Sequence, residues 1–198
     1  MTRSPLILAS TSRYRRELLG RLRLPFEVVS PEVDETALPG EAPAPMAARL
    51  ALAKARAVAA LHPGAVVIGS DQVCDLGGQA LGKPGDHANA ARQLRQLSGH
   101  TAVFHTAVAV VQAGTGFEQS ALATVRVRFR ELSDQDIDRY LHLDQPYDCA
   151  GSAKCETLGI ALLESIESDD PTALIGLPLI RTCELLRQAG LDLLAAAR

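Results

Sequence analysis

The sequence predicts an α/β fold with a mixed β-sheet, and two observations support this class. Short apolar runs typical of strands alternate along the chain with segments whose apolar residues recur at helical spacing. Two strand segments, 101–112 and 120–129, are separated by a short turn at 113–116, so we expect them to pair antiparallel. Of the 198 residues, 47% are hydrophobic and 22% charged, a mixture typical of one globular domain spanning 1–198.

The first half of the chain alternates strands with helices. Apolar runs of four or five residues are typical of buried strands, whereas leucine and alanine at three- and four-residue intervals indicate helices. The hydroxyl of Ser12 suits a helix start, a proline-rich loop at 39–45 precedes a helix, and Gly77-Gly78 predicts a hairpin turn. The expected elements are a strand at 5–9, a helix after Ser12, a strand at 26–29, a helix at 46–61, a strand at 65–69 and a helix at 86–97.

The second half begins with the antiparallel pair. In residues 125–130 three apolar side chains alternate with three arginines, which predicts one buried face and one solvated face. Ser133, followed three residues later by Asp136, predicts a capped helix. The remaining expected elements are a helix from Ser133 to Leu143, a last strand at 158–165 and a last helix at 178–189 that ends before Gly190.

The composition excludes several classes of partner. The chain carries 20 Lys and Arg against 23 Asp and Glu, a net charge of −3, so no general basic surface for a nucleic-acid polymer is expected. Aromatic residues make up only 4%, which argues against a single-strand binder built on base stacking. Four scattered cysteines without a CxxC pair, and only five histidines, argue against a zinc site or a disulfide framework. Without an apolar run near the ~20 residues of a membrane span, and without an export signal, we expect no membrane association and a cytoplasmic location.

Positive charge is concentrated near the N-terminus. Residues 1–30 carry six arginines against two glutamates, whereas residues 131–198 carry five basic and thirteen acidic residues. Within the first segment, residues 10–16 place hydroxyls and arginines where a strand turns into a helix, and helix N-termini favour anions. The pattern favours a local anion site, with a capped helix and solvated arginines as the alternative.

Acidic residues follow two predicted strands, at positions where α/β sheets form sites. Pro31-Glu-Val-Asp-Glu35 holds three carboxylates, and such oxygen ligands suit Mg²⁺ or Mn²⁺, although an exposed acidic loop is the alternative. Asp71, after the most apolar strand, is a candidate metal ligand or general base, or else a turn residue. Lys54 and Lys83 are candidate partners for it, although Lys54 alone is explained by an aliphatic stem that reaches solvent from an apolar helix face. Acids, cations and a metal together indicate a polyphosphate ligand.

A series of short motifs runs in order through nearly the whole chain. They are Leu8-Ala-Ser-Thr-Ser12, Arg15-Arg16-Glu-Leu-Leu19, Pro31-Glu-Val-Asp-Glu35, Arg49-Leu-Ala with Lys54-Ala, Gly69-Ser-Asp-Gln-Val73, Gly82-Lys-Pro84, Ala91 to Ser98-Gly99, Cys149-Ala-Gly-Ser152 and Gly176-Leu-Pro-Leu179. Together they resemble the Maf family of nucleoside triphosphate pyrophosphatases. The resemblance implies a long mixed sheet flanked by helices, with two lobes and a central cleft, similar to inosine triphosphate pyrophosphatases. It also implies hydrolysis of a nucleoside triphosphate to the monophosphate and pyrophosphate, a divalent metal (Mg²⁺ or Mn²⁺) and a homodimer.

The resemblance also assigns roles to residues. Asp71 corresponds to the catalytic proton acceptor and a metal ligand, and the metal-binding carboxylates are expected in the order Glu35, Asp34, Glu32. Lys54 and Lys83 correspond to catalytic cations, and Ser10 and Arg15 complete the phosphate-binding set. These roles agree with the chemistry, because metal and cations neutralise charge that develops on the α-phosphate and on the leaving pyrophosphate.

Three positions indicate the base that is accepted. Gly69-Ser-Asp-Gln-Val73 resembles the branch of the family that prefers 7-methyl-GTP, and its specificity positions correspond here to Tyr14, Gln72 and Glu156. Methylation at N7 makes the guanine ring cationic, so an aromatic face on Tyr14 and a carboxylate on Glu156 would suit it. This sequence departs from the family by having Arg13 in place of the usual proline and Tyr14 in place of the tryptophan usual in that branch.

Two other functions remain open from the sequence alone. The nearest is a pyrophosphatase for dTTP, UTP or modified pyrimidines, against which Gln72 and Glu156 argue. The second is a non-catalytic nucleotide-binding regulator of septum formation, against which the complete set of carboxylates and lysines argues.

Overall fold

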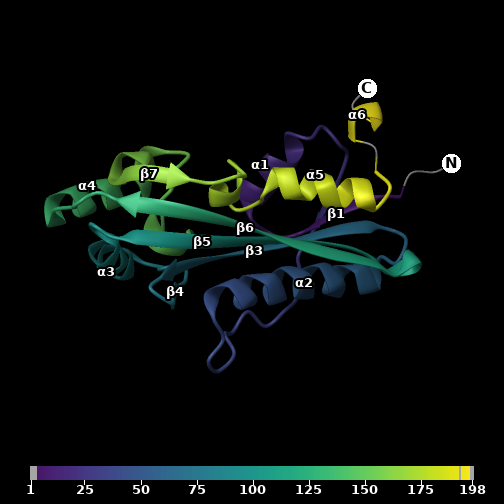
Figure 1. The fold of residues 1–198 in the computed structure, drawn as a ribbon, viewed down its shortest axis with the longest axis horizontal. Helices are drawn as coiled ribbons and strands as arrows, with labels where there is room; N and C mark the ends of the chain where they lie inside the picture. Colours follow the sequence, from purple (N-terminus) through teal and green to yellow (C-terminus); the bar gives the residue numbers. More distant parts are fainter. Residues whose placement is uncertain (1–3, 192, 197–198) are drawn as a thin grey trace.

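The computed structural model describes residues 4–191 and 193–196 and contains a seven-stranded sheet with helices on both faces (Figure 1). The strands are β1 (Leu6–Ala9), β2 (Glu27–Val29), β3 (Val66–Leu76), β4 (Gln79–Leu81), β5 (Thr101–Gln112), β6 (Phe117–Phe129) and β7 (Leu163–Glu167). The α-helices are α1 (Arg13–Gly20), α2 (Pro43–Leu61), α3 (His87–Leu97), α4 (Asp134–Asp144), α5 (Leu179–Gln188) and α6 (Leu193–Ala196). Among the described residues, we find no helix with the length and apolarity needed to cross a membrane.

The sheet is mixed, as the sequence predicts. Its strand order is β2-β1-β3-β5-β6-β7, and β4 pairs with β3 beside this path. The first strand is parallel to β2 and β3, whereas β3–β4, β3–β5, β5–β6 and β6–β7 are antiparallel. The expected antiparallel pairing of the two long central strands, β5 and β6, is therefore confirmed.

The sheet is narrow at its centre. Along one edge of β3, β1 pairs with residues up to Gly69 and β4 begins to pair at Cys74, so Ser70–Val73 lack a strand partner on that edge among the described residues. At this level β7 has not yet joined β6, because its pairing begins at Arg126. In the described part of the chain only β3, β5 and β6 cross the centre, whereas five strands lie side by side at either end. We call this three-strand segment the waist; it separates two lobes.

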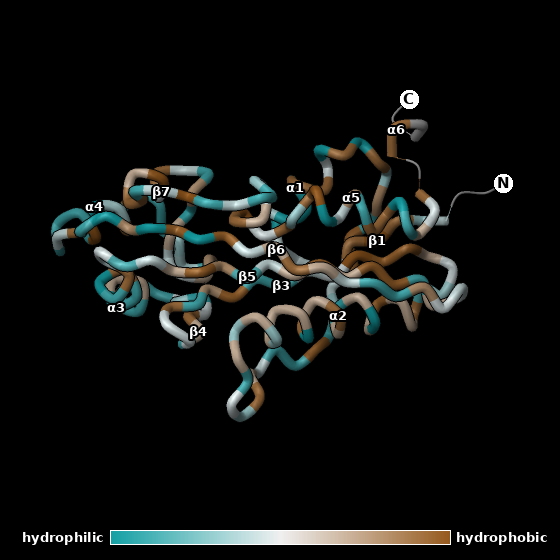
Figure 2. Tube along the Cα trace, in the orientation of Figure 1, coloured by the Kyte–Doolittle hydropathy of each residue, from teal (hydrophilic) through white to brown (hydrophobic). Residues whose placement is uncertain are grey.

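Each lobe has its own apolar core. In the first lobe, α2 covers one face of the sheet through Ala51, Ala55 and Val58, while α1 and α5 cover the other (Figure 1). Figure 2 shows the apolar residues concentrated around β1 and the adjoining parts of the sheet. In the second lobe, α3 and α4 pack on the apolar side of β6, whose other side carries exposed arginines such as Arg126. The predicted buried and solvated faces of this strand are thus confirmed.

Glycine at position 69 allows α2 to approach β3 closely. A Cβ added to Gly69 would overlap the carbonyl oxygen of Ala51 and would lie 2.6 Å from the backbone nitrogen of Ala55. We expect Gly69→Ala to push the helix away and to lower the free energy of unfolding by about 1–3 kcal/mol, the usual cost of overpacking a core. Urea unfolding measures this, with Gly20→Ala as the control, because a Cβ at Gly20 meets no neighbouring atom. Equal stabilities for the two variants would contradict the close approach.

Several predicted boundaries are wrong. Helix α2 starts at Pro43, not at 46, because prolines fit the first turn of a helix. Asp71 does not follow its strand but lies inside it, since Ser70, Asp71 and Gln72 pair with β5. The strand predicted at 158–165 is a 3₁₀ helix at Leu158–Leu162 followed by β7. Short-range backbone bonds such as that from Ile160 to Thr157 replace strand pairing there, and Gly159 lies so close to the backbone of Lys154 that a Cβ would overlap it. A sixth helix, α6, follows the helix predicted to be last, and β6 begins three residues before its predicted start at 120.

Candidate active site

A cavity of about 730 Å³ opens at the waist, where β1 has ended and β4 has not begun. Its walls come from both lobes: the end of β1, α1 and α2 on one side, and the segments near Lys83 and Cys149 on the other. Nine of the residues predicted for the site line it together: Ser10, Tyr14, Arg15, Glu35, Lys54, Asp71, Gln72, Lys83 and Glu156.

Lys54 joins two carboxylates at the end of the cavity beside α2. Its Nζ lies 2.7 Å from Oδ1 of Asp71 and 2.7 Å from Oε1 of Glu35. The side chain of Lys54 is 5% exposed and that of Asp71 11%, whereas that of Glu35 is 53% exposed. Because an unpaired buried charge is costly, the lysine needs these partners. The alternative interpretation of Lys54, an aliphatic stem that carries its ammonium group into solvent, is therefore excluded.

The amphipathic pattern of α2 places the lysine there. Lys54 lies between Ala51 and Val58 on the buried stripe of the helix, at the three- and four-residue spacing that faces the sheet. Gly69 brings this stripe close to β3, and Asp71 lies two residues further along the strand, on the same face. The helix and the strand therefore hold the pair together from two sides.

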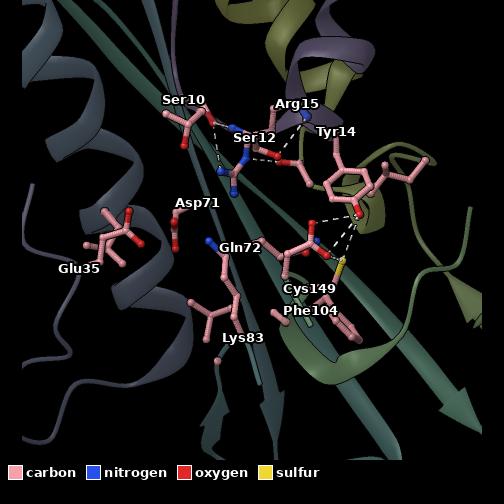
Figure 3. Close-up of a pocket in the computed structure, with 18 of the residues that line it drawn as sticks. Ser10, Ser12, Tyr14, Arg15, Glu35, Asp71, Gln72, Lys83, Phe104 and Cys149 are labelled. Atoms are coloured by element: carbon pink, nitrogen blue, oxygen red, sulfur yellow. Dashed lines mark hydrogen bonds between the residues drawn. The ribbon is translucent and has the colours of Figure 1, made fainter. Parts of the chain in front are cut away.

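Arg15 and Lys83 add positive charge near the two carboxylates. Burial raises the pKa of Glu35, but the hydrogen bond and charge of Lys54, with the charges of Lys83 and Arg15, hold that pKa below its ordinary value. Burial also lowers the pKa of Arg15, and the charges of Asp71 and Glu35 oppose that shift. In Figure 3 the side chains of Glu35, Arg15 and Lys83 surround Asp71 from different sides.

The start of α1 is held by hydroxyls. Ser12 is the predicted N-cap, and its Oγ accepts a hydrogen bond from the backbone nitrogen of Arg15. Oγ of Ser10 accepts from the backbone nitrogen of Ser12 at 3.1 Å, and Nη1 of Arg15 lies 3.5 Å away from it. Nε of Arg15 donates to the carbonyl oxygen of Gly176 at 2.9 Å, which fixes the guanidinium group in the cavity wall.

An aromatic ring and acidic groups lie at the opposite end of the cavity from Glu35 and Asp71 (Figure 3). The hydroxyl of Tyr14 donates to Asp148 at 3.3 Å, and Sγ of Cys149 lies 3.8 Å from the oxygen of the same hydroxyl. Burial raises the pKa of Tyr14, which keeps this hydroxyl a donor. Glu156 lines the same cavity and accepts a hydrogen bond from the thiol of Cys155.

The amide of Gln72 is largely engaged by the protein. Its nitrogen donates to Oγ1 of Thr106 at 3.0 Å and to the carbonyl oxygens of Ala173 and Leu174 at 2.9 and 3.0 Å. Within the described residues, no hydrogen bond reaches its amide oxygen. Gln72 thus anchors the segment at 173–176 on the waist and offers the cavity an acceptor, not a donor.

Asp34 and Glu32 are separated from the other predicted metal ligands. Neither residue lines the cavity, and Oδ1 of Asp34 accepts a hydrogen bond from the backbone nitrogen of Thr36 at 2.9 Å. Hydrogen bonds from the side chain and the backbone of Thr36 lower the pKa of the exposed Asp34. Of the three carboxylates in the loop, only Glu35 is brought to Asp71.

A scan against family models matches residues 5–189 to the Maf-like protein family. The chain belongs to the Maf family. Curated relatives named 7-methyl-GTP pyrophosphatase include one from Polaromonas sp., which is 68% identical over 98% of this chain and 89% of its own length. Two more carry the same name: one from Albidiferax ferrireducens is 63% identical over 96% of both chains, and one from Bordetella pertussis is 60% identical over 94% of this chain and 93% of its own length. Among solved structures, a HAM1 protein from Coxiella burnetii shares 18% identity at a TM-score of 0.47, over 64% of this chain and 73% of that one.

Two charged residues that line this Maf-family cavity, Arg13 and Asp148, were not predicted as site residues. Asp148 lies between the hydroxyl of Tyr14 and Nζ of Lys154, which is 3.6 Å from Oδ1 of Asp148. Burial raises the pKa of Asp148, but the charge of Lys154 helps to hold that pKa below its ordinary value. Arg13 lies 4.7 Å from the centroid of the Tyr14 ring and donates to its hydroxyl at 2.6 Å. The position of Asp148 directly before Cys149-Ala-Gly-Ser152 is the sequence signal that could have found it.

Proposed function

We propose that this Maf-family chain hydrolyses 7-methyl-GTP to 7-methyl-GMP and diphosphate. The observation that carries the proposal is the different chemistry of the two ends of the cavity. One end combines Arg15, Lys54 and Lys83 with two carboxylates, and the other combines an aromatic ring with acidic groups. Such a cavity suits a molecule that has a polyphosphate at one end and a cationic ring at the other.

The base would lie against Tyr14. N7-methylated guanine is cationic, so it is attracted to an aromatic face and to nearby carboxylates. Glu156 would accept hydrogen bonds from guanine N1–H and the exocyclic amine, and Asp148 would add negative charge next to the ring. Gln72 would contribute its amide oxygen. The names of the relatives at 58–68% identity support this base over a pyrimidine.

A divalent metal fits the opposite end. Glu35 and Asp71 converge on one point, where both now bind Nζ of Lys54, and carboxylate oxygens are the ligands that Mg²⁺ and Mn²⁺ prefer. We propose these two as the metal-binding residues, with Asp34 the weaker candidate because its carboxylate binds its own loop. Such an ion, when bound, neutralises phosphate charge and lowers the pKa of a coordinated water.

The chain's own residues would carry the remaining steps. Arg15, Lys83 and the hydroxyl of Ser10 would bind the phosphates and place the α-phosphorus near Asp71. Asp71 would accept a proton from the attacking water while the oxygen of that water bonds to the α-phosphorus. The bond from that phosphorus to the bridging oxygen breaks, and diphosphate leaves with its charge balanced by the cations. Lys54 would hold the Asp71 carboxylate in place.

The proposal also covers the setting of the reaction. We infer a single domain over 1–198, and the continuous sheet through both lobes supports it. A cytoplasmic homodimer that acts on free nucleotides is part of the same proposal, and the resemblance to the family supports it.

The proposal predicts a substrate order. With Mg²⁺ or Mn²⁺, we expect 7-methyl-GTP to be hydrolysed with a higher kcat/KM than GTP, dTTP or UTP, because only its base is cationic. Release of pyrophosphate across these four nucleotides measures this order. Faster turnover of dTTP or UTP would refute the proposed base, and tight binding without turnover would instead support a regulator.

A variant pair tests how the base is recognised. Glu156→Gln keeps the shape of the side chain but removes the charge that attracts the cationic ring of 7-methyl-GTP and not the neutral ring of GTP. The preference for 7-methyl-GTP over GTP should therefore fall about tenfold, the equivalent of about 1.4 kcal/mol. Glu164→Gln is the matched control, because this exposed glutamate pairs with Arg128 outside the cavity. An unchanged preference in Glu156→Gln would remove this residue from base recognition.

A further inference from the structure

A cluster of potential metal ligands lies in the second lobe, outside the cavity lining. His87 is the first residue of α3, and Asp138 and His142 lie one turn apart on α4. One ligand atom from each of these three side chains lies within 4.8 Å of the others. The rings of the two histidines face each other edge-on, with centroids 5.0 Å apart. Two helices therefore present two imidazoles and one carboxylate at a single point.

The spacing of His87 and Asp138 suits a bridging cation better than a direct ion pair. Nε2 of His87 lies 3.4 Å from Oδ1 of Asp138. Nδ1 of His142 lies equally far from that oxygen but donates to the backbone oxygen of Asp138, so Nε2 is the ligand atom of that ring. Hydrogen bonds from nitrogen to oxygen are shorter, about 2.7–3.2 Å. By contrast, ligands about 2.0–2.1 Å from a tetrahedral zinc ion lie about 3.3–3.4 Å from one another.

Neighbouring groups fix the tautomers of both rings. The hydroxyl of Tyr147 donates to the carbonyl oxygen of Leu141 and lies 3.2 Å from Nδ1 of His87, so it accepts the Nδ1 proton. Nδ1 of His142 lies 2.8 Å from the backbone oxygen of Asp138, which can only accept. Each ring thus keeps its proton on Nδ1 and has the lone pair on Nε2, the usual arrangement of metal-binding histidines.

We propose that His87, Asp138 and His142 bind one Zn²⁺ ion per chain. Imidazole-rich sets prefer zinc to magnesium or manganese, whereas the carboxylates at the waist have the opposite preference. The cluster lies where α4 ends, and the C-terminal dipole of that helix favours a cation. The sequence argument against zinc considered local spacing, whereas these ligands come from two separate helices.

The zinc site would brace two segments that line the cavity. Lys83 lies four residues before His87, and Asp148 directly follows Tyr147. The backbone nitrogen of Gly85 already donates to the carbonyl oxygen of Tyr147 at 3.0 Å, which joins the two segments. An ion shared between α3 and α4 would hold them together more firmly.

Zinc binding by the full chain tests the proposal. Equilibrium dialysis with Zn²⁺, in excess Mg²⁺ to fill the carboxylate site, should show one bound ion per chain. Tyr147→Phe removes only a supporting group and should weaken zinc binding about tenfold. His142→Gln and His87→Gln each remove a ligand and should weaken zinc binding more. His100→Gln is the matched control, because this exposed histidine bonds to the backbone of Ser98. Binding that excess Mg²⁺ removes, or that survives both ligand substitutions, would overturn the site.

Two further measurements separate this site from a thiol site. Cys149 and Cys155 are the alternative zinc ligands, so the absorption spectrum of the Co²⁺-loaded chain should lack the charge-transfer band of a cobalt thiolate. With Zn²⁺ bound, amide hydrogen exchange should slow at 82–87 and 144–149 in the unsubstituted chain but not in His142→Gln. A thiolate band, or equal exchange in both chains, would overturn the proposal.

Discussion

Replacing Asp71 with asparagine is expected to slow pyrophosphate release by about 10²–10⁴-fold, the range that positioned acid–base groups contribute. Asparagine keeps the shape of the side chain and an oxygen acceptor for Nζ of Lys54, but it cannot take a proton from water. Nucleotide binding should survive, because Arg15, Lys83 and Ser10 are unchanged. A fall in kcat without a matching loss of affinity is therefore the expected signature.

A second aspartate on the same strand provides the control for Asp71→Asn. Asp75 lies four residues further along β3, on the same face, and bonds to His105 outside the cavity lining. Steady-state kinetics and nucleotide binding should be measured for both variants. Asp75→Asn should turn over at nearly the normal rate. If Asp71→Asn does the same, Asp71 has no part in the mechanism.

Replacing Lys54 with methionine should damage both activity and stability. Methionine fits the apolar stripe of α2 but leaves Asp71 without its cation. We expect turnover to fall by at least about tenfold and the free energy of unfolding by about 3 kcal/mol, the lower end for a broken buried pair because Glu35 is half exposed. Arg56→Met is the control on the same helix, because its pair with Glu118 is at the surface and should contribute less than about 1 kcal/mol.

The pH dependence of stability separates this effect from lost packing. The pKa of Glu35 lies below its ordinary value of 4.5, so its ionised form stabilises the fold above that pH and the contribution is lost as the pH falls. Lys54→Met removes the main cause of the shift. The difference in unfolding free energy between the two proteins should therefore be largest near pH 7 and should shrink below about pH 4.5. A difference that does not change with pH would indicate packing alone.

The sequence was sufficient for most strands and helices and for most candidate residues of the site, but not for their geometry. Ser70, Asp71 and Gln72 are polar and follow an apolar run, so they resemble the end of a strand. They continue it because β5 supplies backbone partners, and that pairing is a tertiary effect that local pattern does not contain. The hydrogen bond that Asp34 accepts from the backbone of Thr36 is likewise not contained in the local pattern.

Residues that act through distant partners were the hardest to find. Asp148 has no periodic pattern around it, and its importance comes from Tyr14, 134 residues away in the sequence. His87 and Asp138 belong to different helices, so no short spacing marks them as a set. Short motifs were sufficient to nominate the charged residues that line the cavity near Asp71, because most of them belong to compact segments.

The narrow waist has a mechanical consequence. Within the described residues, the β3–β5 and β5–β6 ladders are the only strand pairings at that level, so fewer backbone hydrogen bonds oppose flexing there than at either end. The groups that would hold a nucleotide are divided across this waist: Arg15 and Lys54 on one side, and Lys83 and Glu156 on the other. A ligand that contacts both sides would link the two lobes. We therefore expect a bound nucleotide to restrict motion between the two lobes and to raise the Tm of the protein.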